Sequence, residues 1–213
     1  MKRAQAVSIG VAAALAIAVG IGAGLWRRAG PSPPPEIGGY VLPTPKPLGT
    51  FELVDDRGTK VTAHDLAGGW SFLYFGYTYC PDVCPLTLVE LADVKKKLAE
   101  RTPRASVSVY FVSVDPQRDT PERLHDYVNY FDPDFHGLTG DVAAITALAN
   151  AVGAVFFVPP GQDEKAYLVS HSSSIALLDP AGDLRAVFTA PHDAEQVAAD
   201  FTKIYARYGG ERR

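Results

Sequence analysis

The chain has 213 residues, of which 47% are hydrophobic and 21% charged, and its formal net charge is −4. This length suits one ordinary domain with an appendage, and the composition excludes disordered, collagen-like and coiled-coil proteins. Residues 1–28 hold four basic side chains and no acidic one, so residues 29–213 carry −8. We expect no nucleic-acid binding by such an acidic body, because that affinity depends on neutralising phosphates.

The first segment in chain order, Ala6 to Trp26, is 21 residues without a charged side chain, flanked by basic pairs. As a helix, such a segment spans about 30 Å, the thickness of the hydrocarbon core of a bilayer. We expect residues 1–28 to form a membrane anchor, with the rest of the chain on the extracytoplasmic (periplasmic) side. The alternative is a cleaved signal peptide, whose apolar stretch is usually shorter, about 7–15 residues.

Residues 29–48 contain seven of the 17 prolines. Proline fixes φ and has no backbone N–H, so we expect this segment to form neither a helix nor an inner strand. The composition predicts a stiff, extended linker over 29–48, which separates the anchor from a folded domain over 49–213.

The folded domain begins with a predicted hairpin, in which Phe51 to Val54 and Lys60 to Thr62 flank an Asp-Asp-Arg-Gly turn. Ser71 to Tyr77 is a nearly continuous aromatic run, typical of a buried central strand. A helix over Pro85 to Arg101 and a second apolar strand over Val107 to Val114 follow. This order is a βαβ unit, so we expect its two strands to be parallel.

The second half alternates helices and short strands. A helix is predicted from about Thr120, with Thr120 as N-cap and Pro121 at the first helical position, to a stop near Asp132-Pro133. The further predicted elements are a helix over Asp141 to Val152, a strand over Ala154 to Val158, paired strands over Ser174 to Leu178 and Leu184 to Phe188, and a helix over Asp193 to Tyr208. The order of elements predicts a thioredoxin-like α/β domain, a central mixed sheet flanked by helices.

The only two cysteines, Cys80 and Cys84, lie between the aromatic strand and the helix after it. Reactive groups gather at this end of an open α/β sheet, and a helix N-terminus lowers the pKa of a thiol. The i, i+4 spacing places the two Cβ atoms roughly 6 Å apart, so the pair could chelate one ion or close a disulfide. A purely structural disulfide is the plain alternative, although a loop this small gains little entropy from it.

Three stretches of the chain resemble the Sco/SenC family of membrane-anchored copper proteins. They are Gly76–Pro85 (GYTYCPDVCP), Phe111–Pro121 (FVSVDPQRDTP) and Tyr167–Ser172 (YLVSHS). The resemblance covers about residues 48–208 and implies a thioredoxin-like fold. It also implies that one copper ion is held by Cys80, Cys84 and His171. The chain departs from the family pattern at Ser170, where an acidic residue usually precedes the ligand histidine and could support its imidazole.

The donor set implied by the resemblance fits copper chemically. Two thiolates suit Cu(I) and an added imidazole suits Cu(II), so either oxidation state could be held. Zinc accepts the same donors, but a closed structural zinc site normally has four protein ligands. Met1 is the only methionine, so the chain offers no thioether axial ligand within its body.

Three functions from different classes are open. The resemblance implies a copper metallochaperone that delivers its ion to the binuclear copper centre of a cytochrome c oxidase subunit in the same membrane. It would be served by an upstream copper donor or a thioredoxin-like reductant. The second is a thiol–disulfide oxidoreductase that reduces the recipient's cysteines, although the usual redox motif has two intervening residues rather than three. The third is a peroxidase, which the fold permits. The peroxidase pattern expects a Thr or Ser three residues before its reactive cysteine, whereas this chain has Tyr77 before Cys80 and Pro81 before Cys84.

For the remaining polar and aromatic residues we expect mainly structural roles. We expect His64, His125, His136 and His192 to be ordinary surface or capping residues. Asp115 and Asp119 precede the helix at Thr120, so capping is their first expectation, with support of the site or docking as alternatives. Tyr77 and Tyr79 are expected to pack around the site and form its rim.

Overall fold

The computed structural model describes residues 16–17, 19–21, 33–158 and 167–210. The chain divides into two units, Met1–Pro34 and Pro35–Arg213. Most of the predicted anchor over Ala6 to Trp26 lies outside the described residues. Within the described part of the chain, no helix has the length and apolar character needed to cross a bilayer.

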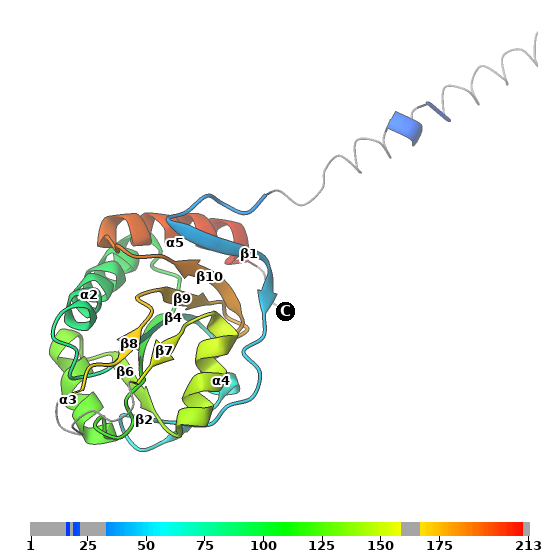
Figure 1. Cartoon of the computed structure of the whole chain (residues 1–213). Coiled ribbons are helices and arrows are strands. Elements are labelled where there is room, and N and C mark those ends of the chain that lie inside the picture. Colours follow the sequence, from blue (N-terminus) through cyan, green and yellow to red (C-terminus); the bar gives the residue numbers. More distant parts are fainter. Residues whose placement is uncertain (1–15, 18, 22–32, 159–166, 211–213) are drawn as a thin grey trace, which may run out of the picture. The chain divides into compact units, whose positions relative to one another are not determined.

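The second unit is built on one mixed sheet of eight strands, in the order β1-β10-β9-β4-β5-β6-β2-β3 (Figure 1). The bounds of these strands are β1 Gly39–Lys46, β2 Leu53–Asp55, β3 Lys60–Val61, β4 Trp70–Gly76, β5 Val107–Ser113, β6 Phe135–Thr139, β9 Ile175–Leu178 and β10 Leu184–Phe188. A separate two-stranded sheet pairs β7 (Phe156–Phe157) with β8 (Ser170–His171).

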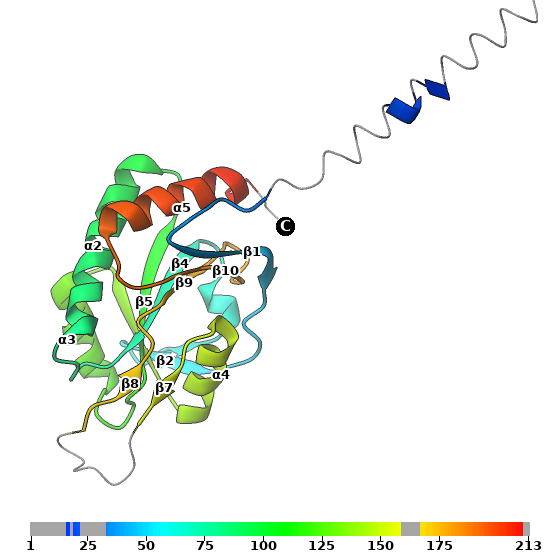
Figure 2. The same cartoon turned by 45° about the horizontal axis from the view of Figure 1, so that its top comes forward.

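Helices cover both faces of the large sheet. Their bounds are η1 Ala63–Leu66, α2 Val83–Arg101, α3 Pro121–Phe131, α4 Val142–Val152 and α5 Ala194–Tyr208. Helices α2, α3 and α5 lie on one face, where α2 packs against α5 and α3, and α4 lies on the other (Figure 2). Since β4, β5 and β6 advance in one direction across the sheet, right-handed crossovers place α2 and α3 on the same face.

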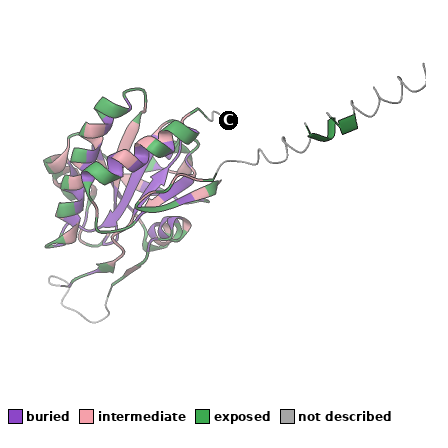
Figure 3. Cartoon of the chain, turned by 90° about the horizontal axis from the view of Figure 1, so that it is seen from above, coloured by how far each residue is buried: buried purple, intermediate pink, exposed green. Residues whose placement is uncertain are grey.

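The core runs along β4, whose seven residues are all buried. Figure 3 shows that the strands inside the sheet are mostly buried. The Phe201 ring of α5 packs edge-on against Trp70, with centroids 5.5 Å apart, and lies 5.7 Å from the ring of Phe72. A strand buried on both faces needs apolar side chains in both directions, which explains the continuous aromatic run in the sequence.

The predicted βαβ unit and both predicted hairpins are confirmed. Strands β4 and β5 are parallel, with Tyr74 opposite Phe111. Strand β2 pairs antiparallel with β3, and β9 pairs antiparallel with β10. The N-cap prediction for α3 is also confirmed, because the Thr120 side chain accepts a hydrogen bond from the Arg123 backbone N–H. The thioredoxin-like α/β fold is therefore the one that the order of elements predicted.

The predicted linker over residues 29–48 is wrong for its second half. Gly39–Lys46 forms β1, which pairs antiparallel with β10 and lies at one edge of the sheet. Pro43 and Pro45 lie within β1, and the register shifts between Val41 and Lys46. An edge strand tolerates proline because one of its sides needs no N–H donors, and an irregularity absorbs the missing hydrogen bonds. The folded unit accordingly begins near Pro35 rather than at residue 49.

Two further elements differ from the sequence prediction. Phe135–Thr139 forms β6, which pairs with β5 in parallel and with β2 in antiparallel, although no strand was expected there. Its HGL centre lacks the β-branched and aromatic pattern that indicates a strand. Helix α2 begins at Val83 rather than at Pro85, which places Cys84 inside its first turn.

Candidate metal centre

The cysteine loop joins the C-terminal end of β4 to the first turn of α2. A turn in which the Cys80 N–H donates to the Tyr77 carbonyl, 3.1 Å away, places Cys80 just before the helix. The Cys84 backbone N–H, free of a helical partner at this first turn, points to the Cys80 sulfur at 3.4 Å. Both thiols are free and largely buried, and only 9% of Cys80 is exposed.

Gly76, the last residue of β4, makes room for the Cys84 sulfur. A Cβ at this position would lie 2.8 Å from Cys84 Sγ and 2.7 Å from Cε2 of the Phe111 ring. Both neighbours are fully buried, so neither has free space to move into. A residue without a side chain at the end of the strand is therefore what lets the sulfur pack directly on the backbone of β4.

His171 reaches the cysteines from a distant part of the chain. It lies on β8, where it pairs with Phe156 of β7. Its imidazole packs edge-on against two tyrosine rings, with centroids 5.9 Å from Tyr77 and 6.2 Å from Tyr74. These contacts hold the ring plane in one orientation beside the cysteine loop.

The three predicted ligands converge. One donor atom from each of Cys80, Cys84 and His171 lies within 4.8 Å of the other two. His171 Nε2 is 3.3 Å from Cys84 Sγ, and its Nδ1 lies 3.0 Å from the Ser172 carbonyl oxygen. Because a carbonyl can only accept, Nδ1 carries the proton and the lone pair of Nε2 faces the sulfurs. The backbone of Ser172 thus orients the imidazole in a chain that has Ser170 in place of an acidic residue.

Burial shifts the pKa of both the Cys84 thiol and the His171 imidazole. It raises the pKa of the Cys84 thiol well above its usual range, although the Tyr77 backbone N–H favours the thiolate. The expectation of a lowered thiol pKa is therefore wrong for Cys84, because loss of hydration outweighs the hydrogen bonds that favour the thiolate. Burial also lowers the pKa of His171, against a smaller rise from its bond to Ser172. The imidazole is therefore neutral near pH 7 and able to act as a ligand.

The capping expectation is wrong for the carboxylate of Asp119, because Thr120 caps α3. Asp119 is instead fully buried and accepts hydrogen bonds from Thr78, at its backbone N–H (2.9 Å) and its hydroxyl (2.6 Å). Asp115 is also buried and accepts from Arg118 Nε at 2.5 Å. The sequence gives no signal for Thr78 as a partner, since the residues are 41 positions apart.

The tyrosines and remaining histidines occupy other settings. Tyr77 is buried against His171, whereas Tyr79 is 44% exposed, with the guanidinium carbons of Arg118 and Arg123 at 4.7 and 4.1 Å from its ring centroid.

The other histidines make separate contacts: His125 contacts Asp56, His136 stacks on Tyr110, His192 donates to the Ser173 carbonyl, and His64 lies in η1. Across the described ranges, Cys80, Cys84 and His171 form the one group of three or more metal-binding side chains that converge.

Comparison with known proteins places the chain among relatives of the same architecture. The SCO1/SenC family profile matches residues 43–206. The mitochondrial protein SCO1 homolog 1 of Arabidopsis thaliana is 36% identical over 160 residues, which cover 75% of this chain and about half (47%) of that protein.

Two solved structures with copper bound are also similar. The chain superposes on Arabidopsis thaliana ScoI with a TM-score of 0.71 at 35% identity, covering 75% of this chain and 98% of that one. Bradyrhizobium japonicum ScoI gives a TM-score of 0.63 at 36% identity, and the match covers 74% of this chain and 98% of that one. The family profile spans most of the folded unit, including all three converging side chains, and the chain therefore belongs to the SCO1/SenC family.

Proposed function

We propose that this protein binds one copper ion through Cys80, Cys84 and His171 and delivers it to the binuclear copper centre of a cytochrome c oxidase subunit. The observation that carries the proposal is the convergence of two sulfurs and one imidazole nitrogen within 4.8 Å. Two thiolates favour Cu(I), and the neutral imidazole extends the set to Cu(II). Copper in two related structures of 35% and 36% identity supports this choice of metal.

The surroundings of the three side chains suit ligand exchange with a protein partner. Three large apolar side chains near the ligands are exposed. Leu86 on α2 and Leu168 are close to them in sequence, and Phe157 pairs with Ser170, the residue before His171. Exposed apolar residues near a reactive site are typical of a contact surface. With three protein donors, an incoming cysteine or histidine can take an open position and displace the ligands one at a time.

We also propose that the apolar segment Ala6 to Trp26 anchors the chain, with the copper-binding unit on the extracytoplasmic side. The support is its 21 uncharged residues, a length that matches the hydrocarbon core. Fractionation of cells that express the full chain tests this: we expect it in the membrane pellet after alkaline extraction. Recovery of a shortened chain in the soluble fraction would instead indicate a cleaved signal peptide.

The ligand assignment is tested by His171→Ala, with His136→Ala as the matched control. Loss of the imidazole should sharply weaken Cu(II) binding and remove the thiolate-to-copper charge-transfer absorption, while the two thiols remain able to form a disulfide. His136 stacks on Tyr110 and is not part of the converging group, so its loss should leave the absorption unchanged. Full copper loading and an unchanged spectrum in His171→Ala would show that the ligand assignment is wrong.

The delivery role is tested by mixing the copper-loaded full chain with the reduced, metal-free copper domain of the oxidase subunit and following the metal. A second candidate, thiol–disulfide exchange, is favoured by the two free thiols side by side. In it, Cys80 and Cys84 give up two protons and two electrons to a recipient disulfide and become a disulfide themselves. Mixing the metal-free chain with an oxidised recipient, and counting thiols on both proteins, separates the two roles.

A further inference from the structure

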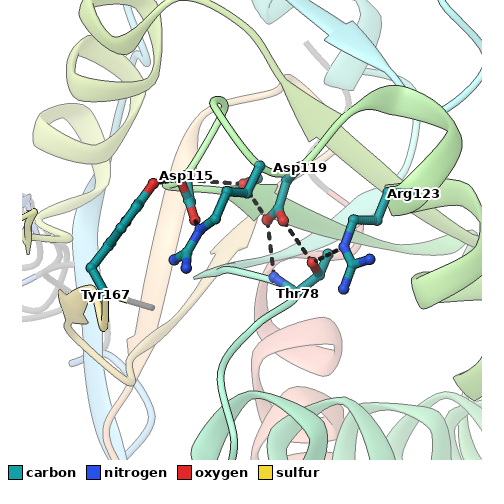
Figure 4. Close-up of polar contacts among 7 residues, drawn as sticks. Thr78, Asp115, Asp119, Arg123 and Tyr167 are labelled. Atoms are coloured by element: carbon teal, nitrogen blue, oxygen red, sulfur yellow. Dashed lines mark hydrogen bonds and ion pairs between the residues drawn. The ribbon is translucent and has the colours of Figure 1, made fainter. Parts of the chain in front are cut away.

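A buried polar cluster lies between the end of β5 and the start of α3, beside the cysteine loop (Figure 4). It is centred on Asp115 and Asp119, whose exposed fractions are 2% and 0%. A carboxylate removed from water to this extent needs several hydrogen-bond donors to remain in place. The donors to these two carboxylates come from both segments that carry the proposed copper ligands.

The first part of the cluster, called the cysteine arm, consists of Asp119, Thr78 and Arg123 and fixes the cysteine loop. Asp119 accepts from the Thr78 backbone N–H and from its hydroxyl, on separate carboxylate oxygens. The same hydroxyl accepts from Arg123 Nε at 2.6 Å, so its donor and acceptor roles are both used. Thr78 stands two residues before Cys80, and its backbone is therefore anchored where the chain leaves β4.

The second part, called the histidine arm, consists of Asp115, Arg118 and Tyr167 and fixes the segment that leads to His171. The Tyr167 hydroxyl donates to Asp115, and the Arg118 guanidinium, which also binds Asp115, lies over the Tyr167 ring at 3.5 Å. Tyr167 stands four residues before His171. Only three residues separate the two, so fixing Tyr167 restricts where β8 can begin.

Ser113 joins the two arms. Its hydroxyl donates to Asp119 at 2.7 Å and accepts from the Asp115 backbone N–H at 3.0 Å. With Thr78 and Ser113 as partners, the two oxygens of Asp119 receive three hydrogen bonds. Through these three bonds Asp119 fixes the backbone at Thr78 relative to the end of β5.

We infer that this cluster sets the separation between the cysteine loop and the histidine strand, and that Thr78 and Tyr167 are positioning residues for the copper site. The inference rests on the proposed function, because it needs Cys80, Cys84 and His171 to share one ion. A site whose ligands come from segments 87 residues apart in sequence needs such a common anchor, because metal–ligand distances tolerate only about 0.2 Å.

The histidine arm is tested with Tyr167→Phe, which removes one hydroxyl and keeps the ring. Tyr127→Phe is the matched control, because the Tyr127 hydroxyl is buried and has no hydrogen-bond partner among the described residues. We expect Cu(II) affinity of the full chain to fall roughly 10-fold to 100-fold in Tyr167→Phe, the usual effect of losing a group that supports a ligand, and to stay unchanged in the control. Wild-type affinity in Tyr167→Phe would overturn the inference.

The cysteine arm is tested with Thr78→Val, with Thr78→Ser as the conservative variant. Valine keeps the shape but loses the hydroxyl, so we expect weaker copper binding and a shifted reduction potential of the Cys80–Cys84 pair in the metal-free chain. Serine should restore both, and Tyr167→Phe should leave that potential at its wild-type value. A Thr78→Val chain that folds, as judged by thermal unfolding, yet keeps the wild-type affinity and potential would contradict the proposed role of Thr78.

A double-mutant cycle distinguishes positioning from general loss of structure. Measured with Cu(I) in both backgrounds, Tyr167→Phe should lower the affinity of the chain that keeps His171 and change that of His171→Ala less than twofold, because the ligand it positions is then gone. An equal loss in both backgrounds would refute the role of Tyr167. Failure of the wild-type chain itself to bind copper is a separate result, which would refute the proposed function.

Discussion

Replacing Gly76 by alanine tests how the end of β4 accommodates Cys84. The added Cβ would lie 2.8 Å from Cys84 Sγ, about 0.6 Å inside ordinary van der Waals contact, and 2.7 Å from Cε2 of Phe111. The ring and the sulfur are both fully buried, and the ring packs against Tyr127 with centroids 5.4 Å apart. The sulfur, the ring or the backbone of β4 must therefore move.

The cost follows from the two opposing effects of the substitution. Overfilling a packed core by one methyl group costs about 1–3 kcal/mol. The lower entropy of the unfolded chain returns about 0.4–1 kcal/mol, because alanine has fewer backbone conformations than glycine. The net loss of roughly 1–2 kcal/mol should lower the melting temperature by about 2–8 °C for a domain of this size. Copper affinity should fall as well, since a sulfur displaced by about 0.6 Å exceeds the tolerance of a metal–ligand distance.

Denaturant unfolding of the metal-free chain and a copper titration measure the two effects separately. Gly38→Ala is the matched control, because a Cβ there meets Asp200 Oδ2 at 3.6 Å and Gln196 Cγ at 3.9 Å, both ordinary contacts. The control should unfold at or slightly above the wild-type denaturant concentration and bind copper normally. If Gly76→Ala were as stable as Gly38→Ala and kept wild-type copper affinity, the packing argument for Gly76 would be refuted.

Three further predictions follow from burial and charge. Burial raises the pKa of Asp200, but hydrogen bonds from the Gly38 N–H and the Lys203 ammonium outweigh it and hold that pKa below its usual value. Asp200→Asn should therefore lower the free energy of unfolding by roughly 1–3 kcal/mol at pH 7. The difference from the wild type should disappear as the pH falls below about 4, where Asp200 becomes protonated. A difference in urea unfolding that does not depend on pH would contradict this. Because burial raises the pKa of Cys84, copper must displace its proton, so apparent affinity measured by chelator competition should rise at least about tenfold per pH unit near neutrality. A flat profile would argue against Cys84 as a ligand. Phe201→Ala should lower the free energy of unfolding by about 3–5 kcal/mol through loss of its contacts with three aromatic rings, and a loss below 1 kcal/mol would refute this view of the core.

The sequence predicted most of the fold, and where it failed the reasons are physical. The aromatic run over 71–77 identified β4 within one residue, since a strand buried on both faces leaves a clear apolar signal. Strand β1 was missed because its prolines suggested a linker, and only the sheet edge beside β10 makes them acceptable. Strand β6 was missed because its pairing with β5, rather than its own composition, holds it in place.

By itself, the sequence determined that two cysteines flank the start of a helix behind a buried strand, because spacing and periodicity are local properties of the chain. Only the tertiary structure brings the His171 imidazole within 3.3 Å of Cys84, fixes its tautomer through Ser172, and makes Asp119 a partner of Thr78. It also decides that burial raises the pKa of Cys84. These properties depend on contacts between residues that the chain places far apart and on the water that folding removes, and neither is encoded in a local pattern.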